Sequence, residues 1–346
     1  MKEKQTNSQL LISLLNDLPD FCTNIFIGRK AERVLNTRLG YARDLKKFFE
    51  FLIDTHPYFC EMKVKQIQPS DMKEVSAEDL DKYIELFSDE HEIKTVARMK
   101  SSISAMYTYL INTLQVIQYN PVLGTQKVKI PPKDYVVYLN LEEQERLLQT
   151  IRYGTGLSER QKKWHTRYIK RDLAMVFLFL DTGMRVSELQ GADNNDVDLN
   201  ECSIIVRRKG GKLSKIYFSD ESAEYLRDYM EEKKQLYPLY AGFKDPLIIS
   251  EKGERLSVRQ YENIVPKYVQ AAIPEKAGLI NCHKLRSSFA MEFYMRDPEY
   301  GGHDILALQQ RMNHQSLTST NVYAKAAQNV SKETRNWRNT QNTPAH

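Results

Sequence analysis

The segment RDLAMVFLFLDTGMRVSELQGA, residues 171 to 192, decides how the second half of this chain folds. Residues 173 to 180 are apolar on nearly every side, which predicts a helix that is buried all round. Gly183 interrupts the pattern, and Arg185 opens a second helix just after it. The segment therefore predicts a buried central helix with an arginine at the start of the helix that follows.

The sequence around this segment is mainly helical. Apolar residues recur at helical spacing in residues 140–151, 222–237, 257–272, 282–296 and 303–312, and we expect an interruption or kink at Pro266. Residues 202–218, CSIIVRRKGGKLSKIYF, contain two β-rich runs on either side of Gly210 and Gly211, the pattern of a β-hairpin. In contrast, residues 311–325, RMNHQSLTSTNVYAK, indicate neither a core helix nor a strand, and we expect a mobile polar segment there.

The first third of the chain predicts a small helical bundle. Residues 38–53 carry apolar side chains at helical spacing, and further helices are expected after Ser76 and from Lys94. Asn120-Pro121 ends the bundle, and Pro-rich residues further on read as a linker. The expected organisation is a bundle with an extra leading helix at 1–125, a linker at 126–139, a second domain at 140–330 and a tail at 331–346.

Composition excludes several classes of protein. No apolar run approaches the ~18 residues that span a membrane, so no membrane partner is expected and the protein is predicted to be cytoplasmic. The four cysteines are far apart, which argues against a zinc site or a disulfide framework. The net charge of +5 is only mildly basic, but Lys and Arg cluster in residues 29–47 and 160–171, as nucleic-acid binding requires.

A set of side chains in the second domain could break a phosphodiester without a metal or cofactor. They are Arg185, Lys209, His283, Arg286, His314 and Tyr323. Two guanidinium groups can clamp the non-bridging phosphate oxygens, and a lysine can protonate the leaving alkoxide. A histidine can remove the proton of a phenol, and the tyrosine can then form a covalent phosphoryl-enzyme intermediate.

The motifs that carry this set resemble those of the tyrosine recombinases, the family of phage integrases and Xer proteins. They are TGMRVSEL, RKGGK, HKLR and MNHQSLTSTNVY, in this order. The resemblance covers residues 140 to 326 and extends less sharply over the bundle at 30 to 125. It implies a mainly α fold with a small β-sheet, in which a SAM-like helical-bundle core-binding domain precedes an α+β catalytic domain.

The resemblance also implies a role for each side chain. Arg185 and Arg286 resemble the two clamp arginines, and Glu188 resembles an acidic residue that supports the first. Lys209 resembles the hairpin lysine that acts as general acid on the 5′-oxygen, with Lys212 as the alternative. His283 resembles the base, His314 a phosphate hydrogen-bond donor, and Tyr323 the nucleophile that takes a 3′-phosphate.

Two positions depart from the family pattern. Asn313 stands where the family often has Gly, and Asn tolerates the left-handed conformation better than most residues. Ser287 stands where the family often has His. Neither departure removes a reacting group.

The resemblance implies a site-specific DNA recombinase that works through a 3′-phosphotyrosyl intermediate. Its use would be chromosome dimer resolution or integration and excision of a mobile element. The implied partners are double-stranded DNA with a pseudo-palindromic site, and further copies of the chain in a homo-tetramer on two sites, on the nucleoid. Residues 326–340 are expected to pack against a neighbouring protomer. Whether an accessory DNA-bending or directionality protein takes part is left open by the sequence.

Candidate DNA-binding residues lie on predicted helices of both domains. They are Arg43, Lys94, Arg98, Lys100, Ser101, Arg259 and Gln260. Two alternatives share the fold: a type IB topoisomerase-like relaxase, and a catalytically silent DNA-binding regulator.

Overall fold

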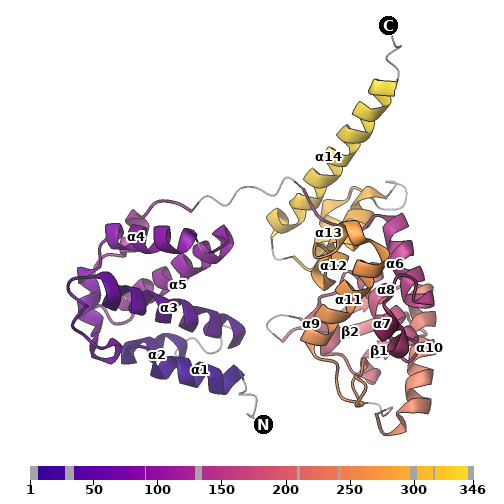
Figure 1. Ribbon diagram of the computed structural model, residues 1–346, viewed down its shortest axis with the longest axis horizontal. Helices are drawn as coiled ribbons and strands as arrows, with labels where there is room; N and C mark the ends of the chain where they lie inside the picture. The colour runs from indigo at the N-terminus through magenta and orange to yellow at the C-terminus, as the bar shows by residue number, and fades with distance from the viewer. Residues whose placement is uncertain are drawn as a thin grey trace. The chain divides into compact units, whose positions relative to one another are not determined.

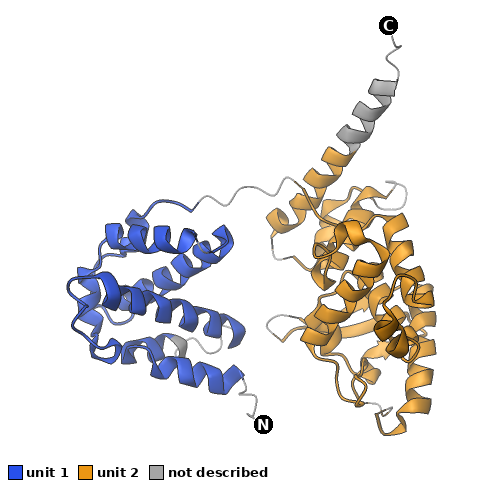
Figure 2. Ribbon diagram, in the orientation of Figure 1, with its two compact units in different colours: residues 1–132 blue, residues 133–346 orange. Residues whose placement is uncertain are grey.

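The chain divides into two compact units, Met1–Pro132 and Lys133–His346 (Figure 2). The division falls inside the segment expected as a linker, residues 126–139. The computed structural model describes residues 7–27, 35–89, 91–128, 135–208, 211–240, 242, 244–296, 302–314 and 316–341, and the side chains up to 330.

Unit 1 is a helical bundle (Figure 1). Its helices are α1 (Asn7–Asn16), α2 (Asp20–Ile27), α3 (Leu35–Thr55), α4 (Ala77–Ser88) and α5 (Ile93–Asn112), with short 3₁₀ turns η1 (Val64–Gln66), η2 (Pro69–Glu74) and η3 (Pro121–Gly124). The apolar face of α3 supplies Phe48, Phe49 and Leu52 to the core, and none of the three is exposed to solvent. Ser76 caps α4 as predicted, because its side chain accepts a hydrogen bond from the backbone N–H of Asp79 at 3.2 Å.

Unit 2 is helical around one small sheet (Figure 1). Its helices are α6 (Leu141–Tyr153), α7 (Glu159–His165), α8 (Ile169–Thr182), α9 (Val186–Gln190), α10 (Asp220–Leu236), α11 (Val258–Ala272), α12 (Cys282–Met295), α13 (Ile305–Met312) and α14 (Leu317–Gln341), with 3₁₀ turns η4 (Asn194–Asp196), η5 (Pro238–Tyr240) and η6 (Pro274–Lys276). The strands β1 (Val197–Asp198), β2 (Ser203–Arg207) and β3 (Leu213–Tyr217) pair antiparallel in that order. The predicted mainly α fold with a small β-sheet is confirmed.

Two local predictions need correction. α11 runs through Pro266 without a break, so the helix is not interrupted there, and a kink at this residue stays a prediction. Residues 311–325 were expected to be non-helical, but most of them are helical. α13 ends at Met312, and α14 begins at Leu317 and carries the rest of the segment. The sequence of this segment gives no clear helical pattern, since most of the described buried residues of α14 are small and only one is large. They are Thr320, Tyr323, Ala324, Ala326 and Ala327.

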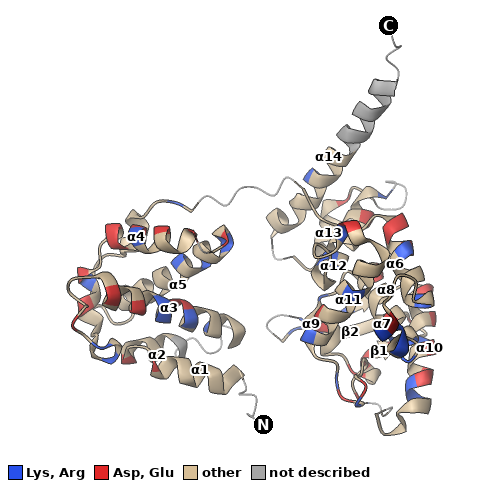
Figure 3. Ribbon diagram, viewed as in Figure 1, with Lys and Arg blue, Asp and Glu red and all other residues tan. Residues whose placement is uncertain are grey.

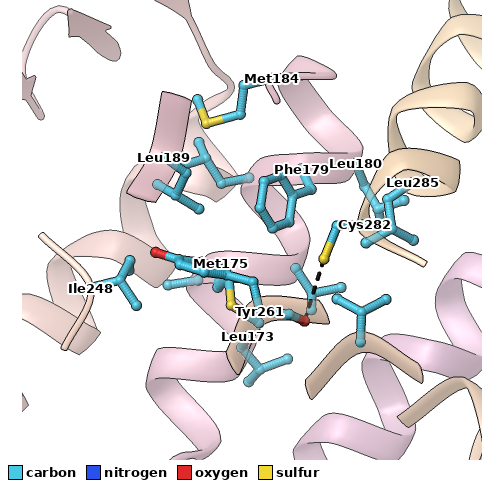
Figure 4. Close-up of a cluster of buried hydrophobic side chains, with 14 of the residues drawn as sticks. Leu173, Met175, Phe179, Leu180, Met184, Leu189, Ile248, Tyr261, Cys282 and Leu285 are labelled. Atoms are coloured by element: carbon cyan, nitrogen blue, oxygen red, sulfur yellow. Dashed lines mark hydrogen bonds between the residues drawn. The ribbon is translucent and has the colours of Figure 1, made fainter. Parts of the chain in front are cut away.

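Helix α8 is the centre of the core of unit 2, as its apolar sequence predicts. Met175 and Phe179 are fully buried, and the ring of Tyr261 from α11 packs edge-on against Phe179 with centroids 6.0 Å apart (Figure 4). The Sγ of Cys282 donates to the backbone oxygen of Tyr261 at 3.4 Å. The first residue of α12 is therefore anchored in the core, which fixes where the following residues of that helix lie.

Gly183 ends α8 in a conformation that only glycine adopts without strain. Its φ is +61°, and its N–H donates to the Phe179 oxygen at 3.0 Å. A Cβ at this position would lie 2.3 Å from Cδ1 of Phe289. The close approach of the turn to α12 therefore depends on the missing side chain.

Gly183→Ala is predicted to destabilise unit 2 by about 3 kcal/mol, because it adds overpacking to left-handed strain. The control is Gly278→Ala, where φ is +74° but no atom lies within 4 Å of the added Cβ. That variant should lose only about 1 kcal/mol, the strain alone. Urea unfolding of the variants measures both losses, and equal losses would show that the approach to Phe289 is not tight.

Candidate active site

The first clamp candidate, Arg185, is held by a carboxylate from its own helix. It is the N-cap of α9, and its backbone N–H donates to Oε2 of Glu188 at 2.8 Å. Its Nη1 donates to Oε1 of the same carboxylate at 2.9 Å. The Arg185 side chain is 38% exposed while that of Glu188 is 2% exposed, so the guanidinium reaches solvent from a buried anchor.

The second clamp candidate, Arg286, joins three segments of unit 2. It lies on α12 and is 2% exposed. Its Nη1 donates to the backbone oxygen of Gly183, and its Nη2 donates to that of Met312. One guanidinium therefore connects α12 to the turn before Arg185 and to the end of α13.

His314 follows α13 through a left-handed residue. Asn313 has φ 47° and ψ 53°, so the Asn at this position adopts the conformation for which the sequence suggested it was suited. The His314 N–H donates to the Gln309 oxygen at 3.1 Å, and its Nδ1 lies 2.9 Å from the Thr320 hydroxyl. Thr320 is fully buried and was not singled out in the sequence, where it is one of several hydroxyl residues.

Tyr323 lies beside His314 on α14. The two rings are stacked with centroids 6.4 Å apart and an angle of 13° between their planes. Tyr323 is only 6% exposed and belongs to an apolar cluster with Phe289, Leu308 and Met312. The candidate nucleophile is thus at the site but covered.

A pocket of about 400 Å³ opens between α9 and the start of α12. Arg185, His283 and Arg286 are among the residues that line it, together with Ser187 and Asn281. His283 is exposed, whereas its neighbour Cys282 is buried. The pocket is therefore lined by both clamp candidates and the candidate base.

Burial and neighbouring positive charges lower the pKa values of two residues of the site, Arg286 and His314. Burial and the positive charge of Arg185 lower the pKa of the Arg286 guanidinium to about 10. Burial, then the charges of Arg286, Arg185 and His283, lower the pKa of His314 to about 4. His314 is consequently neutral near pH 7, and the site is positive enough to attract a phosphate.

Lys209 lies outside the described residues, and its alternative Lys212 is at the foot of the same hairpin. The backbone oxygen of Lys212 accepts from the N–H of Arg208 at 2.8 Å. Arg208 itself was not among the predicted site residues. It is 6% exposed and its Nη1 lies 3.4 Å from Oε1 of Glu188, which no spacing in the sequence indicated.

The candidate DNA-binding residues of unit 1 differ in how free they are to reach DNA. Figure 3 marks Lys and Arg positions in blue on several helices of unit 1, among them α3 and α5. Arg43 on α3 and Lys94 on α5 are exposed. Arg98 donates to Oδ2 of the buried Asp44 at 2.6 Å, so it holds α5 against α3. Lys100 donates to the Gln126 oxygen at 2.6 Å, and Ser101 donates to an oxygen of its own helix.

In unit 2 the two candidates lie in the first turn of α11. Both Arg259 and Gln260 are exposed. The Gln260 side chain accepts from the backbone N–H of Ser257 at 2.9 Å, so it also caps its helix. Arg43, Lys94 and Arg259 are exposed, and the side chains of the other four candidates are engaged in hydrogen bonds within the protein, so these three are the strongest DNA-binding candidates.

His314 is predicted to make the stability of the DNA-free protein depend on pH. Its pKa falls from 6.5 to about 4 on folding. Stability from the neutral ring is therefore fully present above pH 6.5 and is lost as pH falls toward 4. Thermal melting of wild type and His314→Gln across this range measures it, and the wild-type curve should be the steeper. Parallel curves would contradict the shift.

Comparisons with known proteins show the family of the chain. A model described as the phage integrase family matches residues 138–329. Tyrosine recombinase XerC of Caldanaerobacter subterraneus subsp. tengcongensis is 29% identical over 310 residues, which cover 87% of this chain and 80% of the relative. Tyrosine recombinase XerC of Treponema denticola is 29% identical over 306 residues, which cover 85% and 90%.

A solved structure is similar in fold. The pre-cleavage complex of the XerH site-specific recombinase bound to difH substrate has a TM-score of 0.61 and 21% identity, and the match covers 92% of this chain and 80% of that one. In the described part of the chain no helix is long and apolar enough to span a membrane. The family model covers more than half of the sequence, and the chain belongs to the phage integrase family as a tyrosine recombinase.

Proposed function

We propose that this recombinase cuts and rejoins DNA through a phosphodiester bond to Tyr323. The observation that supports this most is that Arg185, His283 and Arg286 line one pocket, while the buried Arg286 also bonds to the end of α13. The stacked rings of His314 and Tyr323 follow directly after that end. Arginine forks match the oxygens of a phosphate, and a phenol can attack its phosphorus. The arrangement therefore suits transfer of a phosphoryl group between DNA and a tyrosine.

The proposed reaction conserves the number of phosphodiester bonds. Tyr323 Oη attacks the scissile phosphorus, His283 accepts the phenolic proton, and the bond from phosphorus to the 5′-oxygen breaks. Lys209 donates a proton to that oxygen, which leaves as a 5′-hydroxyl. Arg185 and Arg286 stabilise the charge on the non-bridging oxygens. Attack by a different 5′-hydroxyl on the phosphotyrosine reverses these steps and joins new strands.

The tyrosine has to move before it can attack. With 6% exposure and an apolar surround, its hydroxyl is covered in the DNA-free protein. Binding of DNA would favour a conformation in which the start of α14 shifts and Tyr323 faces the pocket. Cleavage would then wait for the substrate, because the uncovered nucleophile is rare without it.

Covalent trapping tests the proposal. Wild type and Tyr323→Phe are incubated with nicked suicide DNA from the genomic neighbourhood of the gene, with EDTA present, and run on a denaturing gel. Wild type should form a protein–DNA adduct and Tyr323→Phe should form none, since the variant differs only by the attacking oxygen. EDTA should have no effect, because no metal takes part in the proposed steps.

Other outcomes favour the alternatives. Specific binding without an adduct on any substrate would favour the catalytically silent regulator. An adduct combined with relaxation of supercoils on DNA of any sequence would favour the topoisomerase-like relaxase. Neither alternative is supported by the family members found, which are named recombinases.

We further propose that the active form is a homo-tetramer on two pseudo-palindromic DNA sites. The part of the chain after Ala327, which includes Trp337, would dock on a neighbouring protomer, whereas Ala326 and Ala327 are buried within unit 2. A mainly apolar pocket of about 600 Å³ at the start of α6 and the end of α12 is a suitable acceptor. Leu141 and Met295, two of its lining residues, are 65% and 42% exposed, so the pocket offers apolar side chains to a partner.

Deleting the residues after 328 is expected to abolish synapsis of two DNA sites while single-site binding is retained. Leu141→Glu should do the same, because it places a charge in the proposed acceptor pocket. The control is Leu239→Glu at a site that is 87% exposed and does not line the pocket. Gel-shift assays with one and two sites measure this, and normal synapsis by the truncated protein would reject the docking.

The cellular role follows from which DNA the protein recognises. Chromosome dimer resolution and integration or excision of a mobile element use the same chemistry, and both would place the protein in the cytoplasm on the nucleoid. An accessory DNA-bending or directionality protein would act through the DNA site. Recombination between plasmid copies of candidate sites, with purified protein alone, would distinguish these uses.

A further inference from the structure

Arg208 is a buried cation that the proposed mechanism does not use. It follows β2 directly. Its side chain is 5% exposed and its guanidinium contacts the Glu188 carboxylate. Oε1 of Glu188 accepts from both Arg185 at 2.9 Å and Arg208 at 3.4 Å. One buried carboxylate is therefore shared by an arginine that reaches the pocket and one that does not.

Arg185 is partly exposed and Arg208 is buried, so only Arg185 can leave Glu188 to reach the pocket. Arg185 is 38% exposed and lines the pocket, so it can turn its guanidinium toward a phosphate. When it does so, Glu188, at 2% exposure, loses part of its pairing. A buried carboxylate without a partner is strongly destabilising, which would hold Arg185 back. Arg208 removes that obstacle because it stays beside the carboxylate.

The donors of Arg208 are not all used in the DNA-free protein. Its Nε is buried and has no hydrogen-bond partner among the described residues. The contact of its Nη1 with Glu188 is also long for a charged pair, at 3.4 Å. Arg208 thus has donor capacity left for Glu188 once Arg185 lets go.

We propose that Arg208 is a positioning residue that takes over the Glu188 carboxylate when Arg185 engages the scissile phosphate. Arg208 also closes the foot of the hairpin, through its N–H to the Lys212 oxygen at 2.8 Å. The same residue, through its backbone and its side chain, therefore links the foot of the hairpin to the Arg185–Glu188 pair. The role of Arg208 rests on the proposed function, in which Arg185 is a clamp for phosphate.

The test is a double-substitution cycle of Arg208→Met and Glu188→Gln, with Arg207→Met as the matched control. Arg207 is the exposed neighbour on β2, so its loss removes the same charge without touching Glu188. At saturating suicide DNA, Arg208→Met should slow adduct formation by at least about tenfold. Arg207→Met should leave that rate unchanged. In the Glu188→Gln background, Arg208→Met should have little further effect.

A second substrate separates positioning from general damage. A methylphosphonate at the scissile position lacks the negative charge that the clamp stabilises, so the defect of Arg208→Met should shrink on it. A defect of equal size on both substrates would overturn the proposal. If Arg208→Met does not fold, Arg208→Lys is measured instead, since it keeps the positive charge but loses the planar guanidinium with its several donors. Wild-type rates for a folded Arg208→Lys would show that Arg208 has only a structural role.

The same cycle measured on unfolding needs no activity. Arg208→Met should lower the urea midpoint less when Glu188 is already Gln, because the carboxylate that needs a partner is gone. Additive losses would overturn the coupling even if the wild type cleaves DNA. If the wild type forms no adduct but the losses are non-additive, the proposed function fails while the Arg208–Glu188 coupling stands.

Discussion

The site depends on one buried guanidinium. Arg286 donates to the backbone oxygens of Gly183 and Met312, so α12, the end of α8 and the end of α13 keep a fixed relation. Those oxygens lie next to the segments that carry Arg185 and His314. Burying a cation is costly, and here carbonyl dipoles offset the cost. The result is a framework that holds the segments of Arg185 and His314 in place before any substrate arrives.

The charges around the Arg286 guanidinium determine the protonation state of His314 and the role of Glu188. Burial and the nearby arginines keep His314 neutral, while Glu188 balances part of the positive charge from the buried side. A phosphate entering the pocket would supply the missing negative charge and raise the pKa of His314 again. A DNA phosphate would therefore complete the electrostatics, while the DNA-free protein has a cationic site beside Tyr323, which an apolar cluster covers.

Sequence reasoning worked where spacing determines structure. The apolar run of α8, the hairpin of β2 and β3, and the order of the motifs around Arg185, Arg286 and Tyr323 were all visible. It failed for the helix that carries Tyr323, because small and hydroxyl residues on α14 give no clear apolar stripe. It also missed Arg208 and Thr320, since their contacts with Glu188 and His314 join segments that are far apart or polar in composition.

The central claim is that Tyr323 leaves its apolar surround and takes a 3′-phosphate of the DNA. The most direct measurement is to digest the trapped adduct with trypsin and nuclease and to locate the remaining nucleotide by mass spectrometry. We expect a nucleotide joined through its 3′-phosphate to the peptide that contains Tyr323, with a free 5′-hydroxyl on the other DNA fragment. A nucleotide on another residue, or a linkage through a 5′-phosphate, would contradict it.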